Sequence, residues 1–471
     1  MPFDQAATAK ALARAAADER AGIDRLCDWL RMPSVGTDPA FDADTRRAGE
    51  WCRDHLKASG FDAELIETAP PAGRGQPAVF AHTPGDDDYN GPHVLFYGHY
   101  DVQPADPIDL WDSPPFEPVI KPAENGIGER IVARGACDDK GQVAMFLEAM
   151  RAWHAETGKA AGGVKMTVLI EGEEESGSAN LERLLETEKA RFEPCDVCVI
   201  SDTGMLARGK PAITYGVRGL AYFEIKLIGP DQDLHSGLWG GRVPNPINEL
   251  AKVIAKLHDD NRRVTIPGFY EGVNGPTQAE LDEWAKLGID PAEQLATIGL
   301  TTEGDVGEAN QTHVARSWAR PTCDVNGIIA GYTGEGAKTV IPSHASAKIS
   351  FRLVDDQNPE KIKDLFFKWL EDNRPAGSKW DLHDHGGGHA ATTPLESDTI
   401  SAASRAIENA CGQPPAMIKS GGSIPVAGLL KANLGLDDDR VHSPNEKFEL
   451  DCYRAGLKSH VALIGELWTI G

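Results

Sequence analysis

The stretch VLIEGEEESGS (168–178) places four carboxylates within five residues, directly after an apolar run. They belong to Glu171, Glu173, Glu174 and Glu175. Like charges so close together repel one another, and burial makes each charge more costly. Two interpretations therefore compete: a solvated loop in which the charge is harmless, and a site that holds a cation.

The same side-chain types recur where other predicted strands and helices begin or end. They are His99 and Asp101 in GHYD, Asp138 and Asp139 in GACDD, and Asp202 in ISD. Any one of these acids alone is more simply explained as a turn or helix cap. In open α/β sheets, however, sites form outside the carboxyl ends of the strands. Together the residues predict one imidazole and several carboxylates converging on one crevice.

So many carboxylates cannot stay ionised in one crevice unless a cation neutralises them. Imidazole and carboxylate ligands without a thiolate suit zinc, manganese or cobalt. One divalent ion would leave carboxylates over, so two ions sharing a bridging carboxylate fit better. Glu174 and Glu175 are adjacent and point to different sides of an extended chain. One of them can therefore bind metal while the other faces a water molecule.

The elements that must position these residues alternate between helix and strand in the first 210 residues. Strands are predicted over 93–102, 165–172 and 196–202, and helices over 138–156 and 179–191. The apolar spacing near the N-terminus predicts one amphipathic helix. This alternation favours an α/β sheet with crossover helices, largely parallel.

The pattern changes after Tyr215. Alternating strands are predicted over 221–229, 347–354 and 379–385, with helices over 245–259 and 358–373 and a polar, Gly- and Pro-punctuated region over 263–321. The tail from about 395 reads as helix and loop. The middle segment therefore predicts a separate α+β module with an antiparallel sheet, inserted into the first domain.

Composition narrows the class of protein. A chain of 471 residues is too long for one core, so two or three domains are expected. A net charge of −25 argues against nucleic acid or an anionic membrane as partner. No run approaches the roughly 18 apolar residues of a membrane span, and the N-terminal stretch lacks the apolar region of a secretory signal. With eight dispersed cysteines, a cytoplasmic protein is expected.

Seven motifs carry a resemblance to a known family. They are, in chain order, GHYDVQP, RGACDDKG, EGEEESGS, DLHSG, GAKTVIP, GGSIPV and HSPNEKF. The chain resembles the M20 family of dinuclear metallopeptidases, in its carnosinase-like, cytosolic non-specific dipeptidase branch. The resemblance implies an α/β catalytic domain, with a mainly parallel sheet flanked by helices, that is split around a lid and dimerisation domain. The expected ranges are 1–213 and 391–471 for the catalytic domain and 214–390 for the lid.

The resemblance also implies two divalent ions per subunit, Zn²⁺ or Mn²⁺, with Co²⁺ as a further option. One ion is expected on His99, Asp138 and Asp202. The other is expected on Asp138, Glu175 and His442, so that Asp138 bridges the two. Asp139, beside that bridging residue, is taken as a tolerated variation.

The remaining roles follow from the same resemblance. Glu174 corresponds to the general base, and Asp101 is expected to accept a hydrogen bond from His99 and fix its tautomer. His235 corresponds to a lid histidine that reaches the site of the other subunit and stabilises the oxyanion. The expected substrate contacts are Thr339, Arg352, His385 and Ser423, with Arg352 suited to pairing a substrate carboxylate.

The leading hypothesis is a metal-dependent dipeptidase that hydrolyses small unblocked dipeptides, with Glu174 activating the attacking water. The expected partners are a small peptide and a second copy of the chain, joined through the lid domain; no nucleic acid and no membrane are expected. An N-acyl-amino-acid amidohydrolase of the same superfamily is the alternative. An inactive binding protein on this fold is disfavoured, because every ligand and the base are present.

Overall fold

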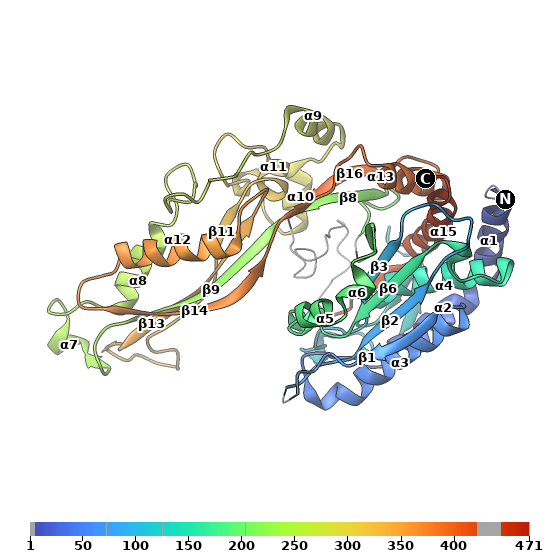
Figure 1. Ribbon diagram of the computed structural model, residues 1–471. Helices are drawn as coiled ribbons and strands as arrows, with labels where there is room; N and C mark the ends of the chain where they lie inside the picture. Colours follow the sequence, from blue (N-terminus) through green and yellow to red (C-terminus); the bar gives the residue numbers. More distant parts are fainter. Residues whose placement is uncertain (1–4, 72, 125, 203, 422–443, 471) are drawn as a thin grey trace. The chain divides into compact units, whose positions relative to one another are not determined.

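The computed structural model describes residues 5–71, 73–124, 126–202, 204–421 and 444–470 (Figure 1). These residues form two compact units. The first contains 5–215, 393–418 and 444–470, and the second contains 216–392 with 419–421. Each unit has its own hydrophobic core.

A five-stranded mixed sheet lies at the centre of the first unit. In spatial order its strands are β1 (Asp62–Ile66), β2 (Ala78–Thr83), β6 (Met166–Glu171), β3 (Val94–His99) and β7 (Val197–Ile200). β6, β3 and β7 are parallel, whereas β1 and β2 are antiparallel additions at one edge. No helix is described between β1 and β2, and strands joined without a crossover helix pair antiparallel. The expected α/β class is confirmed, with the parallel part confined to the three strands that the sequence patterns identified.

Helices cover both faces of this sheet (Figure 1). α4 (Lys140–Thr157) packs on β3, where Phe146 stacks on Phe96 at 3.6 Å between ring centroids. Around α4 lie α1 (Gln5–Ala17), α2 (Glu19–Leu30), α3 (Asp42–Ala58) and α15 (Leu450–Leu467). On the opposite face, α5 (Leu181–Thr187) leads into α6 (Lys189–Phe192), whose Phe192 meets Phe80 edge to face.

Two helix expectations are wrong in detail. The single N-terminal helix is two helices, because the backbone at Asp18 (φ −93°, ψ 2°) leaves helical geometry and α2 begins at the next residue. The helix expected over 179–191 is likewise divided, into α5 and α6, at Glu188.

The C-terminal segment contributes strands as well as helix. α13 (Asp398–Cys411) is followed by β16 (Ala416–Ser420), and β17 (Lys447–Glu449) precedes α15. β17 pairs with β5 (Arg130–Val132), which pairs with β4 (Val119–Lys121). The sequence indicated only helix and loop here, because strands this short carry too little periodicity to be recognised. The pairing with β5 brings the residues after Pro444 beside those that precede α4.

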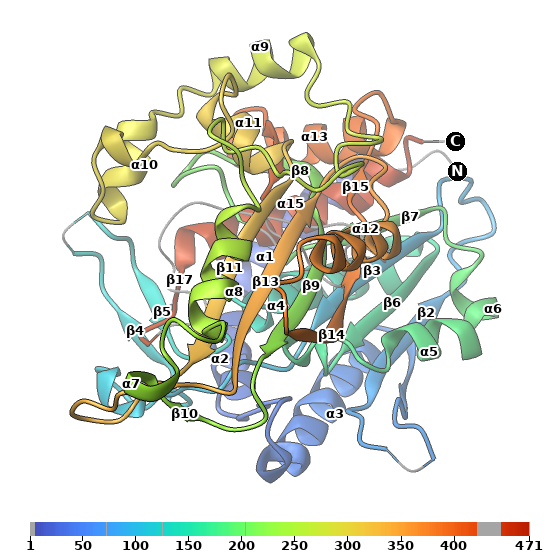
Figure 2. The same cartoon turned by 90° about the vertical axis from the view of Figure 1, so that its left-hand side faces the viewer.

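The second unit is built on a four-stranded antiparallel sheet. Its order is β11 (Thr322–Ala330), β13 (His344–Leu353), β9 (Gly219–Ile228) and β14 (Lys379–Gly388). α8 (Pro246–Ala255) and α12 (Pro359–Asp372) pack on one face (Figure 2). Alternate residues of β9 and β13, such as Phe223 and Phe351, point into that core. The polar residues between them lie on the other face.

Short elements complete the second unit. They are β8 (Ala212–Val217, at the junction), β10 (Leu234–His235), α7 (Ser236–Trp239), α9 (Gln278–Lys286), α10 (Pro291–Thr297), α11 (His313–Trp318), β12 (Val340–Ile341) and β15 (Ala391–Thr392). The polar region 263–321 thus contains three short α-helices and a 3₁₀ turn (Thr302–Gly304), and α9 begins with a capping box between Thr277 and Glu280. None of the helices described in either unit has the length and apolar character needed to cross a membrane.

Candidate metal centre

The candidate site lies where the parallel strands of the first unit end. His99 is the last residue of β3, Asp202 follows β7 by two residues, and Asp138 lies two residues before α4. Because β3 and β7 are parallel neighbours, their carboxyl ends share one edge of the sheet. Asp138 reaches the same edge at the start of the helix that crosses between β3 and β6.

These three side chains form a compact group. His99 Nε2 lies 3.1 Å from Asp138 Oδ1 and 3.7 Å from Asp202 Oδ2. One candidate ligand atom from each residue lies within 4.8 Å of the others, as ligands of one ion would. Burial lowers the pKa of His99, but hydrogen bonds to Asp101 and Asp138 outweigh burial and hold that pKa well above its usual value. The structure therefore brings together all three residues predicted to hold the first ion.

Asp139 gives an independent indication that a cation belongs here. Its side chain is fully buried, and Oδ2 accepts a hydrogen bond of 3.1 Å from the His99 backbone N–H. Its other oxygen, Oδ1, has no hydrogen-bond partner among the described residues. Burial, reinforced by the charge of Asp202, raises the pKa of Asp139 well above its usual range. A buried carboxylate oxygen without a donor, beside an imidazole and two further carboxylates, fits a divalent cation.

Asp101 links the end of β3 to the EGEEESGS stretch. Its Oδ1 and Oδ2 accept hydrogen bonds from the backbone N–H groups of Glu174 (3.2 Å) and Glu175 (3.1 Å). His99 Nδ1 lies 3.1 Å from the Asp101 carbonyl oxygen and 3.5 Å from the carboxylate. The expected contact between His99 and Asp101 is thus made mainly by the main chain, while the carboxylate holds the turn that carries the two glutamates.

Glu174 and Glu175 occupy a short 3₁₀ turn after β6 (Glu174–Ser176). Burial raises the pKa of Glu174 well above its usual value; the charge of His99 opposes this effect, and those of Asp202 and Glu175 reinforce it. Glu175 Oε2 and its carbonyl oxygen accept from Gln103 Nε2 at 2.9 and 3.0 Å. Glu174 therefore belongs to the electrostatic environment of the three-residue group, and the ligand role of Glu175 stays a prediction.

The other two acids of the stretch are buried. Glu171 accepts hydrogen bonds from Tyr97 Oη and from Ser178 Oγ (2.7 Å), and burial raises its pKa to about 7. Glu173 accepts from Thr68 Oγ1 (3.2 Å) and from Asn180 Nδ2 (2.9 Å). Glu171 is 3% exposed and Glu173 is 8% exposed, so these acids do not belong to a solvated loop.

Glu446 is a structural contributor that the sequence patterns did not single out. With Arg134 it forms an ion pair of 2.6 Å in which each side chain is only 1% exposed. The Glu446 carboxylate also accepts from the backbone N–H groups of Gly135 (3.2 Å) and Cys137 (2.9 Å). These bonds fix the loop that leads to Asp138. The sequence signal for Glu446 was its place in the HSPNEKF motif. The motif alone does not indicate that the partner of Glu446 is Arg134, which lies 312 residues away in the chain.

Comparison with known proteins identifies the family. Residues 95–466 match the family described as Peptidase family M20/M25/M40. The chain belongs to this family. It is 33% identical to the Cys-Gly metallodipeptidase DUG1 of Candida albicans, over 93% of this chain and 92% of the relative. It is 31% identical to the human Beta-Ala-His dipeptidase, over 94% and 90% respectively. The solved structure of an M20 metallo-carboxypeptidase, Sso-CP2 from Sulfolobus solfataricus, superposes with a TM-score of 0.81 at 30% identity, covering 95% of this chain and 99% of that one.

The second unit of this M20 peptidase carries four of the remaining predicted residues. His235 is exposed in β10, and its Nδ1 accepts from the Gly237 N–H at 3.0 Å. β10 pairs with β12, and the Thr339 carbonyl oxygen accepts from the Ser236 N–H at 3.1 Å, so His235 and Thr339 lie close together. Arg352 lies on β13 and His385 on β14, at opposite sides of β9. His385 packs against Tyr222 at 5.0 Å between ring centroids.

Two predicted residues lie outside the described part of the chain. They are Ser423, a predicted substrate contact, and His442, a predicted ligand of the second ion. The roles assigned to them stay predictions.

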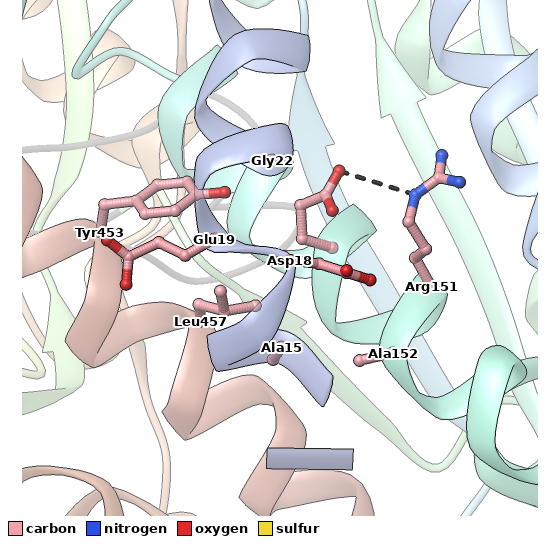
Figure 3. Close-up of a pocket in the computed structure, with 9 residues that line it drawn as sticks. Ala15, Asp18, Glu19, Gly22, Arg151, Ala152, Tyr453 and Leu457 are labelled. Carbon is pink, nitrogen blue, oxygen red and sulfur yellow. Dashed lines mark ion pairs between the residues drawn. The ribbon is translucent and has the colours of Figure 1, made fainter. Parts of the chain in front are cut away.

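A hollow elsewhere in the first unit of the M20 peptidase does not compete with this site. It lies between α2, α4 and α15 and is too narrow to admit a water molecule (Figure 3). Its wall includes Tyr453 and the Glu148–Arg151 pair, whose charged atoms are 3.7 Å apart. These side chains stabilise the packing of the helices, and the hollow between them has no space for a ligand.

Proposed function

We propose that this M20 peptidase is a metal-dependent dipeptidase that hydrolyses the amide bond of small unblocked dipeptides. The observation that carries the proposal is the group of His99, Asp138 and Asp202 with the half-buried Glu174 beside it. The relatives named Cys-Gly metallodipeptidase and Beta-Ala-His dipeptidase, each matched over more than nine-tenths of this chain, support dipeptides as the substrate class.

The proposal includes two divalent ions per subunit, Zn²⁺ or Mn²⁺. His99, Asp138 and Asp202 would hold one, and Asp138, Glu175 and His442 the other. When bound, such ions polarise the scissile carbonyl and lower the pKa of water. The positive charge of the ions would then offset the repulsion between the carboxylates, so that these side chains can lie close together while ionised.

The chain's own residues supply proton transfer and orientation. Glu174 takes a proton from the attacking water and passes it to the leaving amine. Burial raises its pKa, and bound cations would draw that pKa back down. His99 donates from Nδ1 to the Asp101 carbonyl oxygen, so that Nε2 presents its lone pair to the metal position. In the second unit, Arg352 would pair the substrate carboxylate and His235 would stabilise the oxyanion.

A substrate panel tests the proposed function. The enzyme loaded with Mn²⁺ or Zn²⁺ should hydrolyse Xaa–Gly and β-Ala–His dipeptides, and a chelator should abolish turnover until metal is restored. Liberated amino acids are measured by chromatography. Release of acetate from N-acetyl amino acids in place of dipeptide cleavage would establish the deacylase alternative. No turnover of any dipeptide by the metal-loaded enzyme would end the proposal.

The similarity to the Sulfolobus metallo-carboxypeptidase favours a second candidate, removal of C-terminal residues from longer peptides. Tripeptides and pentapeptides in the same panel separate the two activities. A dipeptidase loses activity when a residue is added at the N-terminus of the substrate, whereas a carboxypeptidase retains or gains it.

The proposal extends to a cytoplasmic homodimer formed through the second unit. β11 is an edge strand with one described neighbour, and Val325, Ile328 and Ile329 on it are 39%, 59% and 65% exposed. Exposed apolar residues along an edge strand are typical of a surface that another chain covers.

Mixed dimers test both the assembly and the role of His235. His235→Ala and Glu174→Gln should each be nearly inactive alone if His235 acts on the other subunit's site. After subunit exchange, an equal mixture should regain about a quarter of wild-type activity, because half of the dimers are mixed and each has one complete site. Light scattering verifies the dimer, and a tagged subunit verifies exchange. Verified exchange without recovered activity would contradict action across the dimer.

A further inference from the structure

Two arginines on the polar face of the second unit's sheet have no carboxylate within ion-pair distance among the residues that the structure describes. Arg218 directly precedes β9, and Leu220 on that strand lies opposite Arg352 on β13. Side chains alternate along a strand, so Arg218, Leu220 and Arg352 share the face that α8 and α12 leave uncovered.

Arg218 is held entirely by backbone carbonyl groups. Its Nε donates to the Gly421 carbonyl oxygen at 2.9 Å, and Nη1 donates to those of Arg320 (3.2 Å) and Arg316 (3.5 Å). No carboxylate of the described chain lies within ion-pair distance of it. This contrasts with its neighbour Arg320, which pairs with Glu308 at 2.7 Å. These carbonyl groups accept from Nε and Nη1 of Arg218 but bring no carboxylate into contact with its positive charge.

Arg352 is in a similar state. Its side chain makes neither a hydrogen bond nor an ion pair with any residue in the described ranges. Burial, reinforced by the positive charge of Arg352, lowers the pKa of Arg218 to about 9. Asp324 is the acid that opposes both effects. Two positive charges against one negative charge leave this corner of the sheet net positive at neutral pH.

Space for a ligand adjoins this corner. Arg218, Thr322 and Asp324 line a cavity of about 840 Å³ within the second unit. Pockets that bind small molecules typically have about 300–1,000 Å³. The full wall of this cavity carries charges of both signs, so the positive charge that favours a ligand carboxylate is that of the Arg218 and Arg352 corner and not of the cavity as a whole.

We propose that Arg218 is a specificity-determining residue whose uncompensated positive charge, beside Arg352, selects substrates with a free C-terminal carboxylate. This inference rests on the proposed function, since it takes the substrate carboxylate to be held at Arg352. The charge of Arg218 acts at a distance, so it favours the carboxylate without requiring a direct hydrogen bond to it.

The test compares Ala–Gly with its C-terminal amide. In the metal-loaded enzyme, Arg218→Met should raise KM for Ala–Gly by about 10-fold and change kcat by less than about threefold, because the lost interaction is one of binding. KM for the amide should stay the same. Arg218→Lys, which keeps the charge but cannot reach all three carbonyl groups, should retain the preference for the free acid.

Two further variants complete the design. Arg374→Met removes the same charge from an exposed arginine of the same unit, paired with Glu371 at 3.0 Å, and should leave both KM values unchanged. Asp324→Asn removes the negative charge that opposes the two arginines. The preference for the free acid should therefore increase, and KM for Ala–Gly should fall by about threefold. Because asparagine matches aspartate in shape, this variant tests the charge even if Arg218→Met fails to fold.

Calorimetry measures the binding of Ala–Gly and of its amide to the metal-loaded Glu174→Gln variant, which should not cleave them. Binding is thus measured without turnover, so the inference is tested separately from the proposed function. A wild-type enzyme that binds Ala–Gly more tightly than the amide but cleaves no dipeptide contradicts the function alone. The inference is overturned if Arg218→Met weakens acid and amide equally, if Arg218→Lys loses as much as Arg218→Met, or if neither compound binds. An unchanged preference in Asp324→Asn would also overturn it.

Discussion

Glu174→Gln should lower kcat for dipeptide hydrolysis by about 10²- to 10⁴-fold, the usual contribution of a positioned general base. Glutamine has the same shape but cannot accept the proton of the attacking water. The turn that carries residue 174 should persist, because Asp101 holds it through the backbone N–H groups of residues 174 and 175, which the substitution leaves intact. KM should change little, since the carboxylate acts on the water and not on the ground-state substrate.

Steady-state kinetics together with metal analysis of the dialysed protein measure this effect. Metal content should match that of the wild type, which distinguishes loss of the base from loss of an ion. Glu182→Gln makes the same chemical change at an exposed position of α5 and should leave kcat unchanged. Activity within about threefold of wild type in Glu174→Gln would show that another group takes the proton.

Asp138→Asn should remove both bound metal and activity. If Asp138 bridges two ions, the amide weakens both sites at once, and the loss of metal-derived stabilisation of the transition state should lower kcat/KM by about 10³-fold or more. Plasma mass spectrometry should find well under one ion per subunit in the dialysed variant. Asp109→Asn, in an exposed segment of the same unit, serves as the matched control and should keep the wild-type metal content.

The same variant has an opposite expected effect on the stability of the metal-free protein. Asp138, Asp139 and Asp202 repel one another when no cation is present, and the pKa of the buried Asp139 is raised partly for this reason. Removing one charge relieves that repulsion, so metal-free Asp138→Asn should melt at a higher temperature than metal-free wild type. Added Mn²⁺ should raise the melting temperature of the wild type but not of the variant, because only the wild type binds the ion tightly. A metal-dependent shift of equal size in both proteins would contradict the assignment of Asp138.

Short-range patterns in the sequence predicted a large part of the architecture. The buried strands over 94–99, 166–171 and 197–200 and helix α4 were predictable, because their apolar periodicity is strong and extends over several residues. Strands as short as β17, and the break at Asp18 between α1 and α2, were not predictable. At such positions, whether a strand forms or a helix continues depends on packing against distant segments, and the local sequence does not indicate that packing.

For the site, the sequence by itself determined which side chains are available and that the ends of parallel strands would gather them. That reasoning placed His99, Asp138 and Asp202 among the candidates, because a parallel sheet places all its carboxyl ends at one edge. The resemblance to the M20 family then assigned these three residues to one ion. Only the tertiary structure decided what surrounds them. It gave Asp101 the backbone of residues 174 and 175 as its partner, and it left one oxygen of Asp139 without a donor in the part of the chain that the structure describes. The pairing of Glu446 with Arg134 and the bond from Arg218 to the Gly421 carbonyl oxygen are of the same kind. These features depend on burial and on contacts between segments up to 312 residues apart, and no local pattern encodes either.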